Sequence, residues 1–445
     1  MKYKQYQKYK DSGIEWIGEI PEKWIISKFN YIVSKSISYG VLVPEWDDNG
    51  VPMIRSGELE TIEGIERNIG KILPSLDEKF QKTRLEGDEI LLTVVGSLGQ
   101  TNLVPKKFAG YNVSRAVAVI RLKAKFYPKF FMYVIKSNYF QNMIEVNKIK
   151  TAQPLINIKV INKILLPIPE FSEQKQITDF IDKETTQLDN LISKSQSQIN
   201  LLQEKRQALI NHAVTNGLDP TVTMKDSGVE WIGEIPEHWE VRKLKFMTKK
   251  INSGITPQGG STIYEDEGIP LLRSQNIHFD GLHLDNVAYI NKEIHDEMKN
   301  SKIIENDVLL NITGASIGRC TIIPNKFGEG NVNQHVCIIR CLNMLDPYFL
   351  KHFLSSKIMQ NLISSSQVGA SREGLTFFEI SNFLTPNPPK SEQKQISDFL
   401  DKQTAQFDEL IAKSKQQINF LQEKRQALIT AAVTGKIDVR NGIAA

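Results

Sequence analysis

The chain has 445 residues, of which 40% are hydrophobic and 24% charged, and a formal net charge of +4. These totals are typical of a globular protein of about two to four domains, and the mild positive charge allows nucleic-acid binding without requiring it. Cys320, Cys337 and Cys341 lack CxxC spacing, so the sequence suggests neither a disulfide framework nor a zinc site. No apolar run approaches ~18 residues, so we expect no signal peptide, no membrane span and a cytoplasmic location.

A long internal repeat organises the chain. DSGIEWIGEIPEKW from Asp11 recurs as DSGVEWIGEIPEHW from Asp226, at an offset of 215 residues. A second segment, from SEQKQITDF at Ser172 to LQEKRQALINHAVT, recurs from Ser391 at an offset of 219 residues. Solenoid repeats have periods of roughly 20–50 residues. The repeat therefore predicts two whole domains, each followed by a helix.

Between the repeated segments the two copies diverge. Both keep short apolar runs, such as EILLTVV and AVAVIRL, and predicted helices such as PKFFMYVIKSNYFQNMI and DPYFLKHFLSSKIMQNLI. This mixture predicts an α+β (mixed α/β) fold for each module. The predicted domains are 1–170 and 217–389 for the two modules, 171–216 and 390–435 for the two long helices, and 436–445 for a tail.

The long helices are predicted from apolar residues that recur every three, four or seven positions. Ser172 and Ser391 are expected as the N-caps. Each helix of about 39 residues would be roughly 58 Å long and have an apolar seam that needs a partner. Because the first helix leaves one module and the second returns from the other, we expect an antiparallel coiled coil. The predicted seam residues are Ile177, Ile181, Leu188, Ile192, Ile199, Leu202, Leu209, Ile396, Leu400, Phe407, Ile411, Ile418, Leu421 and Leu428.

Two similar but unequal modules on a rigid spacer are suited to a target with two parts. Half-sites on one face of duplex DNA lie about 34–36 Å apart, a distance that such a spacer could span. Since the modules share a fold and differ in their middles, we expect them to read two different half-sequences. The repeat thus predicts a split, asymmetric recognition site.

The candidate DNA contacts are polar and basic residues on segments punctuated by glycine or serine in the divergent middles. Arg suits guanine, Asn or Gln suits adenine, and Ser or Thr suits either base. For any single residue, a solvated or capping role is an equal alternative. The candidates are Arg55, Ser56, Ser97, Gln100, Ser114, Arg115, Lys150, Thr151 and Gln153 in the first module, and Arg273, Gln275, Asn276, Ser316, Arg319, Gln334, His335, Ser371 and Arg372 in the second.

Over nearly its whole length the chain resembles the specificity subunits of type I restriction-modification enzymes. In that family an EWIGEIPEHW-like motif opens each target recognition domain, and SEQKQI with a heptad helix ending in LQEKRQALI closes it. The resemblance implies a non-catalytic DNA-recognition subunit. It also implies two methyltransferase (modification) subunits that bind S-adenosylmethionine and methylate adenine, and motor-nuclease (restriction) subunits that use ATP and Mg. No cofactor is expected in this chain itself.

Two other classes of function stay open. The first is a self-contained methyltransferase or nuclease. Asn387-Pro388-Pro389-Lys390 resembles the NPP(Y/F) motif of adenine methyltransferases, but Lys390 replaces the aromatic residue that stacks on a flipped base. The phosphate-binding GxxxxGK(S/T) loop is absent from the sequence. The second class is a coiled-coil adaptor without DNA specificity.

The histidines and tryptophans are assigned no chemistry. His212, His238 and His335 lack paired ligand spacing, so no metal site is predicted. The tryptophans beside the repeat boundary are expected to pack on the helix ends rather than to stack on bases. These tryptophans are Trp16, Trp24, Trp231 and Trp239.

Overall fold

The computed structural model describes residues 3–59, 62, 69–367 and 374–440. The chain forms two compact units. Unit 1 comprises Met1–Gln196 and Gln416–Ala445, and unit 2 comprises Ser197–Lys415. Each unit therefore holds one globular module together with one half of each long helix.

The module of unit 1 is built on a four-stranded sheet with the strand order β4-β10-β7-β8. A second sheet has the order β6-β5-β9, and the pairs β1-β2 and β3-β11 complete the module. Strand β10 runs antiparallel to β7, whereas β9 runs parallel to β5. The strands are β1 (Tyr9–Asp11), β2 (Glu19–Pro21), β3 (Ile25–Lys28), β4 (Ser38–Tyr39), β5 (Trp46–Ile54), β6 (Lys71–Ile72), β7 (Ile90–Thr93), β8 (Thr101–Leu103), β9 (Asn112–Val113), β10 (Val117–Ile120) and β11 (Leu165–Ile168).

The module of unit 2 repeats this topology strand for strand. Its sheets have the orders β15-β23-β20-β21 and β19-β16-β22, with the pairs β12-β13 and β14-β24. The hairpin β17-β18 lies between β16 and β19 in the chain. The strands are β12 (Met224–Asp226), β13 (Glu234–Pro236), β14 (Glu240–Lys243), β15 (Thr248–Ser253), β16 (Ile269–Leu272), β17 (Ile277–His278), β18 (Gly281–Leu282), β19 (Ala288–Ile290), β20 (Val308–Asn311), β21 (Cys320–Ile322), β22 (Asn331–Val332), β23 (Val336–Cys341) and β24 (Leu384–Asn387).

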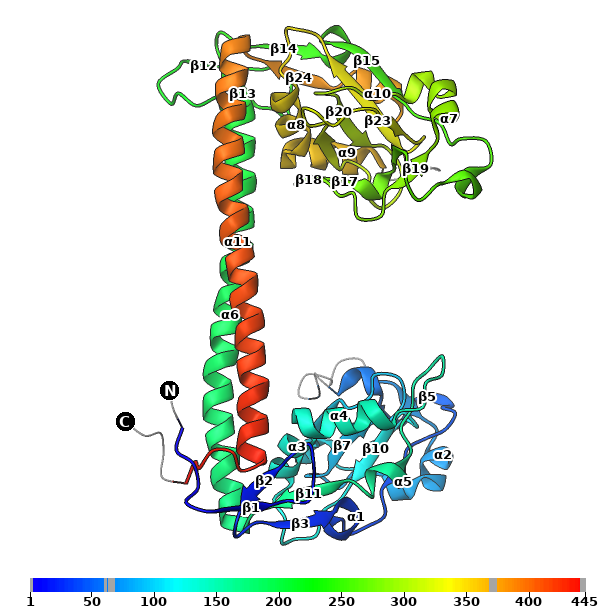
Figure 1. Ribbon diagram of the computed structural model, residues 1–445, viewed down its shortest axis with the longest axis vertical. Coiled ribbons are helices and arrows are strands. Elements are labelled where there is room, and N and C mark those ends of the chain that lie inside the picture. The colour runs from blue at the N-terminus through cyan, green and yellow to red at the C-terminus, as the bar shows by residue number, and fades with distance from the viewer. Residues whose placement is uncertain (1–2, 60–61, 63–68, 368–373, 441–445) are drawn as a thin grey trace. The chain divides into compact units, whose positions relative to one another are not determined.

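Helices cover the sheets in both modules, as Figure 1 shows. Helix α3 packs on β7 and β8, and α8 packs in the same way on β20 and β21. Their aromatic residues, including Phe130 and Phe131 in α3, are fully buried in the core. The mixed α/β fold predicted from the sequence is confirmed. The module helices are α1 (Phe29–Ile32), α2 (Pro74–Lys79), α3 (Pro128–Lys136), α4 (Asn138–Asn147) and α5 (Ile158–Ile161), then α7 (Lys292–Glu297), α8 (Pro347–Ser355), α9 (Lys357–Gln367) and α10 (Phe377–Ser381).

The two long helices are α6 (Phe171–Asn216) and α11 (Lys390–Val433). In unit 1, Arg425 of α11 contacts Asp189 of α6, with 2.9 Å from Nε to Oδ1. In unit 2, Arg206 of α6 contacts Asp408 of α11, with 3.1 Å between the same atoms. Within each unit the first part of one helix packs beside the last part of the other, so the pairing is antiparallel. All fourteen predicted seam residues are buried or half-buried.

The expected serine caps were wrong. Helices α6 and α11 begin one residue before Ser172 and Ser391, so both serines lie inside the first turn. Buried glutamines two residues further along fasten each helix start instead. The Gln174 amide accepts from the Tyr127 N–H (2.8 Å) and donates to the Pro169 carbonyl (2.9 Å). Gln393 makes the equivalent bonds to Asp346 (2.6 Å) and Pro388 (2.8 Å).

The repeated EWIGEIPE segments pack where the long helices meet the modules. Trp24 shares a core with Ile177 near the start of α6 and Val433 at the end of α11. Trp239 shares a core with Ile396 near the start of α11 and Val214 near the end of α6. Trp24 and Trp239 therefore pack on helix ends, as predicted, whereas the prediction was wrong for Trp16, which is 55% exposed. Among the helices in the described part of the chain, none combines the length and the apolar character that a membrane crossing requires.

Candidate nucleic-acid interface

In unit 1 the candidate DNA contacts lie on loops that are hydrogen-bonded to one another. Strands β5, β7 and β9 end at the edge of the sheets where β10 begins. The backbone bonds Ser114 N–H to Ile54 O (2.9 Å), Val94 N–H to Ala116 O (2.8 Å) and Gly96 N–H to Pro154 O (2.8 Å) join the loops there. We call residues 54–56, 94–100, 114–116 and 149–156 the first loop edge. Candidates that are up to about a hundred residues apart in sequence thus share one edge.

Unit 2 has an equivalent edge, whose loops are also joined by backbone hydrogen bonds. Asn333 N–H donates to Leu272 O (3.0 Å), Ile312 N–H to His335 O (3.0 Å) and Leu375 N–H to the carbonyl of Ile312 (2.8 Å). We call residues 272–276, 312–319, 333–335 and 374–375 the second loop edge. Ser371 and Arg372 fall outside the described residues. The remaining candidates of the second module all lie on this edge.

The first loop edge presents mostly exposed polar groups. Ser97, Arg115, Lys150, Thr151 and Gln153 are exposed, while Ser56, Gln100 and Ser114 are half-buried. Arg55 is exposed but already paired, because its Nη2 and Nε lie 2.6 and 3.0 Å from Glu58 Oε1. A guanine would have to compete with Glu58 for that guanidinium. Of the two candidate arginines, Arg115 is thus the more accessible.

The second loop edge is more internally bonded. Arg273 Nη2 and Gln275 Nε2 both donate to the Asn286 carbonyl, at 3.0 and 3.2 Å. Asn276 is only 1% exposed, and its amide donates to the His283 carbonyl at 2.8 Å. Asn276 therefore holds the turn and is not presented at the surface. Ser316 and Arg319 are half-buried.

His335 and Gln334 belong to a chain of polar side chains on this edge. Thr256 Oγ1 donates to Gln334 Oε1, Gln334 Nε2 lies 3.0 Å from His335 Nε2, and His335 Nδ1 lies 2.6 Å from Thr313 Oγ1. In this arrangement the imidazole accepts at Nε2 and donates at Nδ1. A base that bonded to the exposed Gln334 would have to replace one of these contacts.

An exposed apolar loop beside the first loop edge was not among the sequence candidates. Leu42 and Val43 are 59% and 71% exposed, and Trp46 is 52% exposed. The loop is tied to the edge because the Arg115 N–H donates to the Val41 carbonyl at 2.8 Å. Apolar side chains can contact the methyl group of thymine. The run of large apolar residues in YGVLVPEW, inside a segment of turn character, was the available signal.

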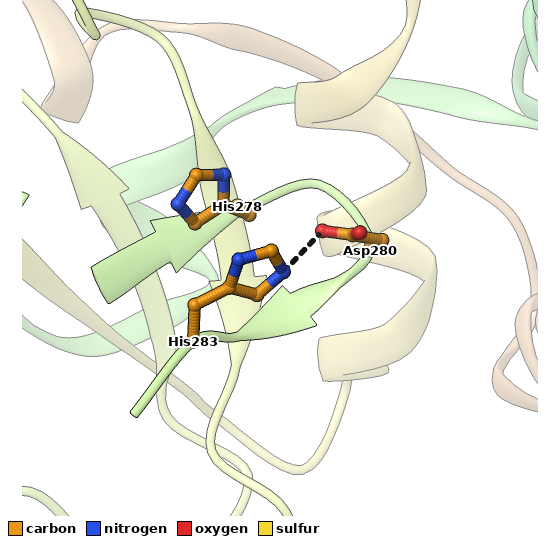
Figure 2. Close-up of side chains that lie close together, drawn as sticks. All are labelled: His278, Asp280 and His283. Carbon is orange, nitrogen blue, oxygen red and sulfur yellow. Dashed lines mark ion pairs between the residues drawn. The ribbon is translucent and has the colours of Figure 1, made fainter. Parts of the chain in front are cut away.

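The structure also brings together three side chains that the sequence left unassigned. His278, Asp280 and His283 surround the β17-β18 hairpin, and one potential ligand atom from each lies within 4.8 Å of the others. Figure 2 shows the two imidazoles stacked, with Asp280 beside His283. The sequence predicted no metal site, because only the spacing of His212, His238 and His335 was considered. Two histidines on either side of a hairpin were not considered.

Groups that could suggest catalysis have structural roles. Asn387 ends β24, which pairs with β14, and its side-chain oxygen accepts from Gln393 Nε2 at 3.3 Å. The NPP sequence is therefore part of the helix anchor. Burial raises the pKa of the Cys320 and Cys337 thiols to about 12, which keeps both in the neutral, weakly nucleophilic form.

The comparisons with known proteins agree on one family. The family model described as "Type I restriction modification DNA specificity domain" matches residues 29–201 and 236–419. The putative type I restriction enzyme MjaX specificity subunit of Methanocaldococcus jannaschii is 27% identical over 443 residues, which cover 95% of this chain and 96% of the relative. The EcoBI specificity subunit of Escherichia coli is 26% identical and covers 73% of this chain and 69% of its own length.

Solved structures share the fold. A chain from a study of complex assembly and conformational transition of the type I R-M system matches with a TM-score of 0.71 and 16% identity, covering 93% of this chain and 98% of that chain. The HsdS subunit from Thermoanaerobacter tengcongensis matches with a TM-score of 0.50 and 16% identity, covering 94% and 98%. The adaptor alternative receives no support from these comparisons. The chain belongs to the type I restriction modification DNA specificity domain family, carries that domain twice, and is a specificity subunit that recognises DNA.

Proposed function

We propose that the first and second loop edges each read one half of a split, asymmetric DNA site. The supporting observation is that the two modules repeat one topology strand for strand while their loop edges carry different side chains. Arg115 on the first edge corresponds to Gln334 on the second, since the strands before them, β9 and β22, are equivalent. An arginine favours guanine and a glutamine favours adenine. The two edges would therefore prefer different bases at equivalent places.

The near-identical long helices would carry two copies of one partner, the methyltransferase subunit. Their seam faces inward, but each helix also has apolar residues on its outer side. Leu191 and Leu201 of α6 are 45% and 50% exposed, and the positions 219 residues later, Leu410 and Phe420 of α11, are 47% and 63% exposed. Single exposed apolar residues are common on protein surfaces, so what matters is their repetition at equivalent positions of the two helices. Their duplication suits a partner that is itself present twice.

The chain would act without chemistry of its own. S-adenosylmethionine would bind to the methyltransferase subunits, and ATP and Mg to the motor-nuclease subunits. The proposal rests on the family and on the structural roles of Asn387, Cys320 and Cys337. A cytoplasmic location would follow from these partners. Radioactive methyl transfer to DNA by the purified chain alone would contradict the proposal that the chain is non-catalytic.

The test is to map methylation in cells that contain this chain and its methyltransferase, before and after residues 30–164 are replaced by those of a relative. The expected result is a new sequence in one half of the split site and an unchanged other half. The matched control replaces residues 245–383, the equivalent part of the second module, and should alter the opposite half. Unchanged methylation after both exchanges would favour the adaptor alternative.

A further inference from the structure

The β17-β18 hairpin of unit 2 turns three metal-ligating side chains outward. Ile277 is fully buried, and Leu282 packs against the same core cluster. Because neighbouring residues in a strand point to opposite faces, His278 and His283 are directed away from that core. Asp280 lies in the two-residue turn between the strands and is exposed. The hairpin therefore fixes the spacing of these side chains without using them in its packing.

The close approach of the two imidazoles depends on Gly281. His278 and Gly281 are direct partners in the β17-β18 ladder. Gly281 has a φ of +144° and no side chain, and no atom lies within 4 Å of where its Cβ would be. The open position lets His283, the diagonal neighbour, lean across the strand onto His278. The ring centroids are 3.9 Å apart and the planes are inclined by 15°.

The hydrogen bonds leave each residue with an atom that can bind a cation. His278 Nε2 lies 3.0 Å from the Gln275 carbonyl, so this nitrogen carries the proton in the neutral ring and Nδ1 keeps its lone pair. A backbone carbonyl that fixes the tautomer in this way is common behind metal-binding histidines. His283 Nε2 lies 3.2 Å from Asp280 Oδ1, and the carboxylate supplies negative charge at the same place.

We propose that His278, Asp280 and His283 form a binding site for a late transition-metal cation of the Zn²⁺ type, completed by water. Imidazole and carboxylate ligands suit Zn²⁺. Ligand atoms at about 2.0–2.2 Å from one ion lie at most about 4 Å apart. The ligand atoms here lie within 4.8 Å of one another, so they need to move by at most about an ångström. The stacked rings must also splay so that both lone pairs point at the ion. Side chains at the surface, such as these two imidazoles, have room to make this movement.

Binding of a cation would stiffen the connection between the β17-β18 hairpin and the second loop edge. Gln275, which fixes the His278 tautomer, belongs to that edge, and the Asn276 side chain bonds to the His283 backbone. A cation across the hairpin would therefore stiffen the turn that carries Arg273 and Gln275. The site is proposed for unit 2 alone, because the comparable segment of unit 1, residues 57–68, contains no histidine.

The test is a calorimetric titration of the full chain, freed of metal by a chelator, with ZnCl2. The expected result is one site per chain, weakened at least tenfold in His278→Ala and in His283→Ala and retained in His212→Ala, which removes an exposed histidine on α6. Zn²⁺ should also raise the melting temperature of the wild type and not that of the double variant, in which both His278 and His283 are changed to alanine. Equal Zn²⁺ affinity in the double variant and the wild type, or no binding by the wild type at micromolar Zn²⁺, would overturn the proposal. Matching melting curves in chelator would show that the variants fold.

Discussion

At the residue scale, equivalent positions in the two modules carry different chemistry on one scaffold. Arg115 and Gln334 follow equivalent strands, and both are exposed. Arg115→Ala should relax one base position in the first half-site and cost about 1–3 kcal/mol of binding. Gln334→Ala should relax a position only in the other half. Binding selections on randomised DNA would measure both profiles, and a uniform loss across all sequences would instead assign Arg115 to phosphate contact.

A second residue pair predicts a difference in acid stability between the units. In unit 1 the Tyr133 hydroxyl donates to Asp182 at 2.6 Å, and in unit 2 His352 takes the place of the tyrosine, with Nε2 2.7 Å from Asp401. Burial lowers the pKa of His352 below its ordinary value of 6.5, although the bond to Asp401 opposes this. As the pH falls below 6.5, the unfolded chain takes up a proton that the folded chain resists. Folding stability should therefore fall by up to about 1.4 kcal/mol per pH unit until the pH reaches the lowered pKa.

The test is thermal unfolding of the wild type and His352→Tyr between pH 7.5 and pH 5. The variant copies the tyrosine–aspartate pair of unit 1, so its melting temperature should depend less on pH. Tyr133→His, the reciprocal change, should add acid sensitivity. If His352→Tyr kept the full acid dependence of the wild type, other groups would be responsible.

At the scale of the element, two neighbouring apolar residues on a long helix separate helix pairing from partner docking. Leu421 belongs to a buried cluster in the seam, whereas Phe420 beside it is 63% exposed. Leu421→Asp removes apolar burial and places a charge in the seam, so it should cost at least about 2–5 kcal/mol of stability. Thermal unfolding measures this loss. Equal melting temperatures for Leu421→Asp and the wild type would contradict the seam assignment.

The outer face gives the complementary prediction. Phe420→Asp and Leu201→Asp change exposed, equivalent positions and should leave the melting temperature within about 1–2 °C of the wild type. They should weaken binding of the methyltransferase subunits, which co-purification and sedimentation would detect. Each single variant should lose one of two partner copies and the double variant both. Full assembly of the double variant would place the docking surface elsewhere.

The elements also show how far sequence reasoning reached. Regular heptad spacing predicted both long helices, because burial of one stripe imposes that period. The inward position of the candidate Asn276 could not be predicted from the sequence. Its amide bonds to the His283 carbonyl, a contact that only the tertiary structure shows. Gln174 and Gln393 belong to the SEQKQI motif that both copies share. Each glutamine is buried and fastens its helix to a module. Near-identity of the two copies there reflects packing within the chain, so it is not evidence of partner docking at these residues.

At the scale of the whole molecule, we predict that the long helices determine the spacing between half-sites. Helix α6 continues from unit 1 into unit 2 without interruption, and α11 continues from unit 2 into unit 1. One added heptad in each helix, after Gln196 and after Lys415, preserves the seam because the apolar period is seven residues. It lengthens each helix by about 10 Å, which equals about 3 base pairs of DNA.

Methylation mapping of this double insertion should show both half-sequences unchanged and the non-specific spacer longer by about 3 base pairs. A heptad in one helix only is the matched control. It leaves seven residues of seam without a partner, so recognition of every spacing should fall. Because the loop edges are untouched, loss of the half-sequences themselves would show that the helices shape the edges as well. An unchanged spacer length after the double insertion would mean that contacts outside the two helices set the distance between half-sites.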